Sequence, residues 1–301
     1  MNMADIATQL RMIGCTVREQ ESMAAHTSFK IGGAADLFVS VGEREQACEV
    51  LRFCRKEAIP LRVVGNGSNL LVSDAGIAGV VLRFEAGDSP FTVDGCRITA
   101  QAGASLKRLC TVACENGLSG LEFAYGIPGT VGGGVYMNAG AYGGELSDTV
   151  RSVTALTPDG ETVVLSAEEL QFGYRHSALM ENGLFVWSVE LELHQGDAVA
   201  IREAMEAHLT ARKEKQPLEY PSGGSFFKRP AGYFAGALIE QSGLKGYTVG
   251  GAQVSEKHAG FVINRGGATC ADVMALCEHV QREVQTKFGV KLEREVQLVG
   301  R

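Results

Sequence analysis

The stretch from Phe123 to Gly144, FAYGIPGTVGGGVYMNAGAYGG, determines the interpretation of this chain more than any other segment. It has no charged residue in 22 positions, and eight of those positions are glycine. The whole chain of 301 residues contains 38 glycines, where average usage of about 7% would give roughly 21. A membrane span needs about 20 mostly apolar residues, whereas this stretch is made mostly of small residues and includes Pro128. We therefore expect a backbone-rich loop inside a globular protein.

The remaining composition is that of an ordinary globular protein of about two domains, with 45% hydrophobic and 21% charged residues. Acidic residues outnumber basic ones by 35 to 28, so nucleic-acid binding has no global electrostatic support. The segment 1–14 lacks a charged region followed by an apolar one, so no secretory signal is expected. These features predict a cytoplasmic protein without a membrane span.

Eight cysteines occur without any Cys-x-x-Cys pair, and no cluster of His, Cys and carboxylate has the spacing of a structural zinc site. Cys110 and Cys114 are four residues apart and lie on the apolar face of a predicted helix together with Leu106. We expect the cysteines to be small core residues in a reducing compartment, and we expect no metal.

The first part of the chain alternates strand and helix patterns. A strand over 35–41 precedes a helix over 43–59, whose apolar residues recur at helical spacing. Two further strands follow at 61–64 and 70–72, which suggests a small α/β unit that ends near Gly79.

The middle of the chain favours short strands within 80–102 and a helix over 105–115. A hairpin is predicted from 149–156 and 162–165, joined by a Pro-Asp-Gly turn, and Ser166 with Glu169 has the spacing of a capping box.

A long helix over 198–215 ends before Pro217, where we place a domain boundary. The last part of the chain should contain a strand over 225–228, a helix over 271–288 and a final strand over 292–299.

Two glycine loops suggest a nucleotide. Gly65-Asn66-Gly67-Ser68-Asn69 lacks the third glycine of a Rossmann motif and lies between two predicted strands, without a following helix. Its backbone N–H groups could form an anion-binding nest, with donors from Ser68 and Asn69. The alternative is a glycine hairpin in which Asn66 and Asn69 are turn residues.

The longer loop over 125–143 costs backbone entropy when it becomes ordered. A ring system with a diphosphate tail, packed against bare backbone, would offset that cost; a tight internal turn is the alternative. No Walker A motif is present, which excludes ATP or GTP hydrolysis of that type.

Several polar residues are candidates for chemistry. Arg175, in the loop Phe172–Ser177, has the side chain best suited to grip a carboxylate, although a surface arginine is also compatible. Ser225 follows two glycines but lacks a nucleophile elbow and triad partners, so a proton donor or structural cap is favoured over a nucleophile. Residues 292–299 alternate, so Glu293, Glu295 and Gln297 share one face of the predicted strand, which composition alone favours as a solvent-exposed face. A basic zone that suits either a diphosphate or a solvated surface comprises Arg212, Lys213, Lys215, Lys228 and Arg229.

Seven segments in order resemble the UDP-N-acetylenolpyruvoylglucosamine reductase (MurB) family, and together they extend from Thr27 to Val296. They are TSFKIGG (27–33), VGNGSNLLV (64–72), GIPGTVGG (126–133), NAGAYG (138–143), YRHS (174–177), GSFFKRP (224–230) and LEREV (292–296).

The resemblance implies an α+β fold, the FAD-binding fold of the vanillyl-alcohol-oxidase (PCMH) type. Two α/β FAD-binding subdomains, 1–79 and 80–216, would precede an α/β substrate-binding domain, 217–301. The implied activity is reduction of an enolpyruvyl ether to UDP-N-acetylmuramate in peptidoglycan synthesis, with NADPH as hydride source and no obligate protein partner. An FAD-dependent oxidase of the same fold and a nucleotide-sugar binding protein without chemistry are the alternatives.

The same resemblance assigns roles to residues. Arg175 and Glu295 would polarise the substrate carboxylate, and Ser225 would protonate C2 after hydride reaches C3. Only 50 positions separate Arg175 from Ser225, which is too few for the tyrosine-bearing insertion of the longer subtype. Substrate would be held by Tyr174, Arg212, Lys215, Lys228 and Arg229. FAD would be held by Gly65, Asn66, Gly67, Ser68, Asn69, Gly126, Ile127, Gly129, Thr130, Gly132, Asn138, Ala139, Gly140 and Ala141.

Overall fold

The chain passes back and forth between two units, each assembled from three segments. A computed structural model describes all residues from Met1 to Arg301. The first unit contains Met1–Glu19, Leu37–Asn66 and Gly79–Ala211, and the second contains Gln20–Asp36, Gly67–Ala78 and Arg212–Arg301. The boundaries expected at 79/80 and 216/217 remain predictions.

A four-stranded sheet near the N-terminus has the order β1-β2-β5-β3. The pairing of β3 with β5 is parallel, with Leu61 opposite Val80. The predicted apolar face of α2 is buried, as its residues Val50 and Leu51 illustrate. The elements are α1 (Met3–Met12), β1 (Thr16–Ser22), β2 (Ala34–Val41), α2 (Arg44–Lys56), β3 (Leu61–Val64) and β5 (Ile77–Phe84).

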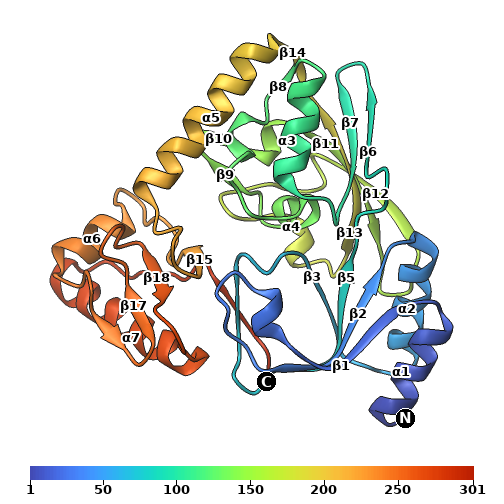
Figure 1. The fold of residues 1–301 in the computed structure, drawn as a ribbon, viewed down its shortest axis with the longest axis horizontal. Helices are drawn as coiled ribbons and strands as arrows, with labels where there is room; N and C mark the ends of the chain where they lie inside the picture. The colour runs from blue at the N-terminus through green and yellow to red at the C-terminus, as the bar shows by residue number, and fades with distance from the viewer. The chain divides into compact units, whose positions relative to one another are not determined.

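A five-stranded antiparallel sheet, ordered β12-β11-β13-β7-β6, forms most of the rest of the first unit. Helix α4 packs on β13 and β7, and α3 contacts α4 (Figure 1). The predicted hairpin is confirmed by the pairing of β11 with β12. The elements are β6 (Phe91–Asp94), β7 (Arg97–Gln101), α3 (Leu106–Glu115), β8 (Leu118–Ser119), α4 (Val131–Tyr136), β9 (Gly140–Ala141), β10 (Gly144–Glu145), β11 (Val150–Leu156), β12 (Thr162–Ser166), β13 (Phe185–Glu192) and β14 (His194–Gln195).

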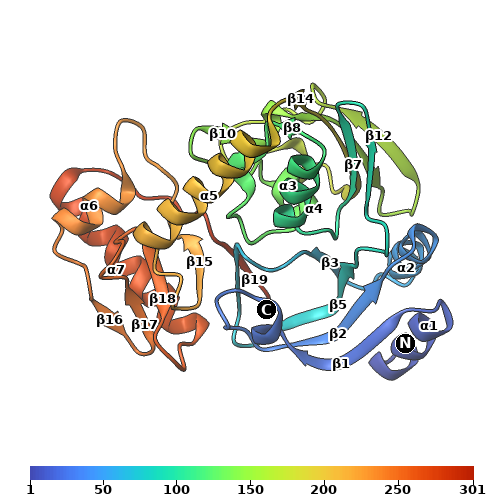
Figure 2. The ribbon, with the colours of Figure 1, turned by 45° about the horizontal axis from the view of Figure 1, so that its top comes forward.

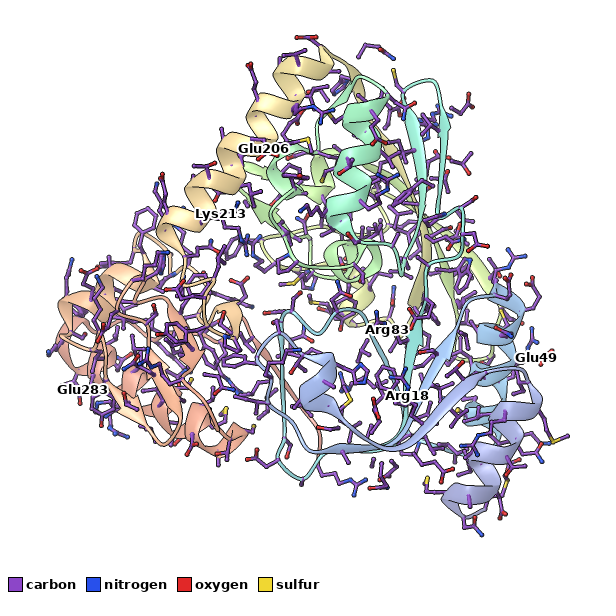
Figure 3. The ribbon with its side chains drawn as sticks, viewed as in Figure 1. Arg18, Glu49, Arg83, Glu206, Lys213 and Glu283 are labelled. Carbon is purple, nitrogen blue, oxygen red and sulfur yellow. The ribbon has the colours of Figure 1, made fainter.

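The predicted long helix is α5, Ala198–Lys215. Only Ile201 and Met205 on this helix are buried, whereas Glu206 and Lys213, which are labelled along it in Figure 3, are exposed. Most of α5 therefore faces solvent.

The predicted capping box at Ser166 forms its hydrogen bonds without starting a helix. The Ser166 N–H donates to Glu169 Oε2 at 2.8 Å, and the Glu169 N–H donates to Ser166 Oγ at 3.3 Å. The chain then forms turns, because Leu170 is fully buried and its carbonyl accepts from the Ala178 N–H, which folds 171–177 into a loop.

The second unit is built on a four-stranded sheet, β15-β18-β17-β16, with α6 and α7, and on a parallel pair of β19 with β4 (Figure 2). Phe29 and Phe226 lie in its core, with ring centroids 6.3 Å apart. The elements are β4 (Leu70–Val72), β15 (Ser222–Ser225), α6 (Ala235–Gln241), β16 (Thr248–Val249), β17 (Ala252–Val254), β18 (Phe261–Asn264), α7 (Cys270–Phe288) and β19 (Gln297–Val299).

Helix α7 is capped at its first turn by a distant residue. Thr269 and Asp272 form the local capping box. In addition, the Asp74 carboxylate accepts from the N–H groups of Cys270 at 2.8 Å and Ala271 at 3.0 Å. A carboxylate at a helix N-terminus satisfies otherwise unpaired donors and interacts favourably with the helix dipole, so the loop after β4 stabilises this helix.

Two predicted strands of the second unit were wrong in extent. The strand expected at 225–228 ends at Ser225: the Phe226 N–H still donates to Gly260, next to β18, but the Lys228 N–H donates to Glu293 in a different segment. The strand expected at 292–299 is reduced to Gln297–Val299, since Glu293 and Glu295 make isolated backbone hydrogen bonds.

The cysteines behave as predicted core residues. All are buried except Cys96, which is half-buried. Burial raises the pKa of the Cys110 thiol to about 12, so this thiol stays protonated and unreactive at neutral pH. No helix is long and apolar enough to cross a membrane, and no three His, Cys, Asp or Glu side chains gather as a metal site would require.

Candidate functional site: two glycine segments and two polar clusters

The first glycine loop, 65–69, connects strands of different sheets. β3 pairs with β5, whereas β4 pairs with β19. The hairpin alternative for this loop is therefore wrong, since the two flanking strands do not pair with each other. Its glycines are needed instead for close approach.

Close contacts, with a side chain at one position and with backbone at the other, leave no room for a side chain at two positions of this loop. A Cβ atom on Gly65 would lie 2.4 Å from Thr130 Oγ1, and one on Gly67, whose φ is +60°, would lie 2.2 Å from the carbonyl oxygen of His26. Asn66 Nδ2 donates to the carbonyl of Pro128 at 3.3 Å. Gly65 and Asn66 therefore contact the second glycine segment, although Gly65 and Thr130 are 65 positions apart in the sequence.

The second segment contains a helix that we did not predict, α4. Thr130 is its N-cap residue and accepts from the Gly133 N–H at 3.2 Å. A Cβ on Gly132 would lie 2.7 Å from Ala102 Cβ, and one on Gly134 would lie 2.9 Å from Leu146 Cδ1. Glycine normally disfavours helix, but here it lets α4 pack directly against its neighbours.

These two segments fit a dinucleotide. They present bare backbone and hydroxyls without a carboxylate, since neither 65–69 nor 123–144 contains an acidic residue. Peptide N–H groups near glycines form anion-binding concavities of the kind a diphosphate requires. The hydroxyl of the buried Thr130 occupies the position that a Gly65 side chain would take, so the two segments are in direct contact. This donor set is compatible with FAD.

Arg175 lies at a tight turn in the first unit. Gly173 and His176 exchange two backbone hydrogen bonds at 3.0 and 3.1 Å, which places Tyr174 and Arg175 at the tip, with Arg175 at φ +53°. The guanidinium donates from Nη2 to Gly140 O at 2.7 Å and from Nη1 to Asn138 O at 3.5 Å. Both acceptors are neutral, so they orient the cation without neutralising it.

Ser225 and Glu295 lie in the second unit on neighbouring stretches of backbone. Ser225 is exposed and is the last residue of β15, while Glu295 is half-buried. The Glu295 N–H donates to Phe226 O at 2.9 Å. Asn69 Nδ2 donates to Glu295 O at 3.1 Å, so the end of the first glycine loop contacts this pair. The structure thus brings Ser225, Glu295 and Asn69 together.

The predicted substrate residues are distributed over both units. Tyr174 is exposed in the first unit, with its ring centroid 5.1 Å from Arg175 Cζ. In the second unit, Arg212 and Lys215 end α5, and Arg229 Cζ lies 4.0 Å from the centroid of the Phe234 ring. Lys228 lies three residues after the end of β15.

Sequence reasoning left one buried polar residue of the Arg175 region without a role. Ser177 is fully buried, and its Oγ donates to Tyr136 O at 2.5 Å. Its place in the segment YRHS could have indicated this role. A serine that becomes buried there needs a hydrogen-bond partner.

Known proteins match both parts of the chain. A family model described as "FAD binding domain" matches residues 35–166, and one described as "UDP-N-acetylenolpyruvoylglucosamine reductase, C-terminal domain" matches residues 216–299. A UDP-N-acetylenolpyruvoylglucosamine reductase from Lachnoclostridium phytofermentans is 49% identical over 301 residues, which covers 98% of this chain and 97% of the relative. The chain belongs to the UDP-N-acetylenolpyruvoylglucosamine reductase family.

Other members of this reductase family agree. A Clostridium botulinum reductase is 50% identical over 281 residues, covering 93% of this chain and 91% of the relative. The crystal structure of the reductase (MurB) from Thermus caldophilus has 39% identity and a TM-score of 0.81, covering 94% of this chain and 99% of that one. The predicted α+β FAD-binding fold is thereby confirmed.

Proposed function

We infer that this protein reduces UDP-N-acetylenolpyruvoylglucosamine to UDP-N-acetylmuramate, with FAD as cofactor and NADPH as co-substrate, in the synthesis of peptidoglycan precursors. The observation that carries this conclusion is the match to named reductases over almost the full length of the chain. The glycine segments 65–69 and 123–144, which carry no charged residue, are compatible with a bound dinucleotide and so support it as well. Bound FAD supplies the hydride transfer between NADPH and substrate.

We propose that Arg175 binds the carboxylate of the enolpyruvyl group. When the double bond is reduced at C3, negative charge develops on C2 and on the attached carboxylate. A guanidinium held by the carbonyls of Asn138 and Gly140 is already oriented for that charge, so little reorganisation is needed as the charge develops. We propose that Glu295 also polarises the substrate carboxylate.

We propose Ser225 as the proton donor to C2. It is exposed at the end of β15 and follows Gly224, whose φ is +82°. A serine hydroxyl is a weak acid, so donation requires a strongly basic carbanion-like acceptor, which C2 becomes once hydride has added to C3. Tyr174, Arg212, Lys215, Lys228 and Arg229 are proposed to hold the remainder of the substrate.

We also propose that the protein acts in the cytoplasm and needs no obligate protein partner. We propose that its chain divides into three domains, 1–79, 80–216 and 217–301. The buried cysteines fit a reducing compartment, where they stay as thiols.

The Ser225→Ala variant tests this function by separating the two half-reactions in a stopped-flow instrument. Reduction of bound FAD by NADPH should stay within about twofold of the natural protein. Reoxidation by the enolpyruvyl substrate should slow by roughly 10²- to 10⁴-fold, the usual contribution of a positioned proton donor. Ser222→Ala, in the same strand, is the matched control. Equal slowing of both half-reactions would remove Ser225 from the role of acid.

The same assay separates the alternatives. A colourless protein that consumes no NADPH would be a binding protein, and bleaching by an alcohol with release of peroxide would identify an oxidase.

A further inference from the structure

Asn138 occupies a helix-terminal position that normally takes glycine. Helix α4 ends at Tyr136, Asn138 has φ +46°, and the N–H groups of Asn138 and Ala139 donate to the carbonyls of Val135 and Gly134. This is the Schellman pattern, in which the left-handed residue is usually glycine. Eight residues of 123–144 are glycine, yet this one is not. An asparagine here therefore requires a reason beyond the backbone turn.

The side chain of Asn138 supplies that reason. Asn138 is fully buried. Its Oδ1 accepts from the Ser147 N–H at 2.9 Å, and its Nδ2 donates to Gly173 O at 3.0 Å and to Ser147 Oγ at 3.4 Å. Both polar atoms of this side chain thus bond to the protein, and one of these bonds reaches Gly173, the first residue of the Arg175 turn. The resemblance places Asn138 among the cofactor residues, but both N–H donors of its amide are used within the protein and the side chain is fully buried.

The hydrogen bonds between 136–140 and the Arg175 turn run in both directions. Asn138 Nδ2 holds Gly173 O, while the Arg175 guanidinium donates back to the carbonyls of Asn138 and Gly140. Ser177 Oγ anchors the other end of the turn on Tyr136 O. All of these residues belong to the first unit. Hydrogen bonds therefore hold the turn at Gly173, its first residue, and at Ser177, the residue that follows it.

Arg175 needs such support because its own conformation is unfavourable. A non-glycine residue at φ +53° is strained, and an isolated two-residue turn would relax. Asn138 opposes that relaxation, since moving Gly173 would take from the buried Nδ2 the nearer of its two acceptors. The guanidinium then stays where Gly140 and Asn138 place it.

We propose that Asn138 is a positioning residue for reduction of the enolpyruvyl group: its buried amide fixes the Gly173–His176 turn and thereby aims the Arg175 guanidinium at the substrate carboxylate. This inference rests on the proposed function. It assigns the Asn138 side chain to orienting Arg175, and it assigns none of it to holding FAD.

The variant Asn138→Gly tests the proposal, because glycine keeps the left-handed backbone at low cost and removes only the amide group. Binding of FAD and its reduction by NADPH should stay within about twofold. Reoxidation by the enolpyruvyl substrate should slow by roughly 10- to 100-fold, the scale of a displacement of about 1 Å in a reacting group. Asn116→Gly is the control, since Asn116 also ends a helix and its Nδ2 donates within that helix, to Val112 O.

A double-variant cycle distinguishes positioning from general damage. If Asn138 acts through Arg175, then Asn138→Gly should slow reoxidation by less than about threefold when Arg175 is already alanine, since coupled residues are not additive. Equal effects in both backgrounds would overturn the proposal. Loss of FAD, or equal slowing of both half-reactions, would also overturn it, because the amide would then serve the cofactor pocket.

Amide hydrogen exchange gives a readout independent of turnover. The His176 N–H, which donates to Gly173 O, should exchange faster in Asn138→Gly, while α3 exchanges as before; unchanged exchange at His176 would contradict the proposal. Asn138→Asp provides a second variant, because aspartate tolerates the left-handed region and keeps the acceptor for Ser147 but cannot donate to Gly173 when ionised. A natural protein that does not reduce the enolpyruvyl substrate would refute the proposed function instead, and the exchange result would still be measurable.

Discussion

Replacement of Gly65 by alanine should damage the first unit through one identifiable collision. The new Cβ would lie 2.4 Å from Thr130 Oγ1, whereas the optimal separation of non-bonded heavy atoms is about 3.5 Å. Thr130 must therefore move by roughly 1 Å. It cannot rotate freely, because its hydroxyl caps α4 by accepting from the Gly133 N–H at 3.2 Å.

The expected loss has two parts. Overpacking costs about 1–3 kcal/mol, and loss of the N-cap costs about 1 kcal/mol. The sum, about 2–4 kcal/mol, corresponds to a drop in the melting temperature of roughly 5–15 °C for a unit of this size. Thermal unfolding of the cofactor-free protein measures it, and the visible absorbance of the purified protein reports how much FAD is retained. We expect Gly65→Ala to be purified with little FAD.

Two further variants make the reasoning refutable. Gly42→Ala is the matched control, because nothing lies within 4 Å of its added Cβ, and it should melt as the natural protein does. Thr130→Gly, introduced together with Gly65→Ala, removes the hydroxyl that is struck and keeps a residue tolerated at an N-cap. Failure of this second change to restore stability would show that the collision is not the cause of the loss.

Two other predictions concern the second unit. Asp74→Ala should lower the free energy of unfolding by about 1 kcal/mol. It should also speed hydrogen exchange in the first turn of α7, whose N–H groups donate to the Asp74 carboxylate. Replacement of the exposed Asp88 by alanine is the control, and equal exchange in both variants would contradict the capping role. Burial lowers the pKa of His258, so the unfolded state binds the proton more tightly and stability is lost as the pH falls below about 6.5. Urea unfolding from about pH 8 to 5 should show a shallower loss in His258→Gln than in the natural protein, while His194→Gln should keep the full slope.

Local patterns predicted the regular elements well. The helix over 198–215 has the predicted ends, because helical periodicity and Pro217 both act within a few residues. The hairpin of β11 and β12 was predictable for the same reason, since its turn is Pro-Asp-Gly. The predicted capping box of Ser166 and Glu169 is confirmed by its two hydrogen bonds, although no helix follows it.

Helix α4 shows why intrinsic preference was misleading. Three consecutive glycines each disfavour helix by about 1 kcal/mol relative to alanine, so a loop was the better prediction. The structure forms a helix there because Gly132 and Gly134 lie against Ala102 and Leu146, at distances that no Cβ could tolerate. Those contacts join residues far apart in the chain and are invisible to local propensity.

The candidate site divides in the same way. Seven short segments sufficed to indicate the family, because backbone loops that bind a dinucleotide impose glycine at particular positions. The sequence could not show that Gly65 packs on Thr130, that Glu295 and Ser225 share neighbouring backbone, or that Asn138 supports Arg175. Each of these depends on which distant segment fills the adjacent space.

The sequence by itself indicated where bare backbone is required, because glycine placement is a local property, and its seven matching segments implied the α+β class, the cofactor and the chemistry through their resemblance to the reductase family. The tertiary structure decided what each glycine and polar side chain is for. The glycine-rich stretch that looked like a uniform loop is partly a close-packed helix, and its one asparagine at a left-handed helix end is a buried link to Arg175. Burial commits a polar atom to a partner, and only the folded chain determines which partner that is.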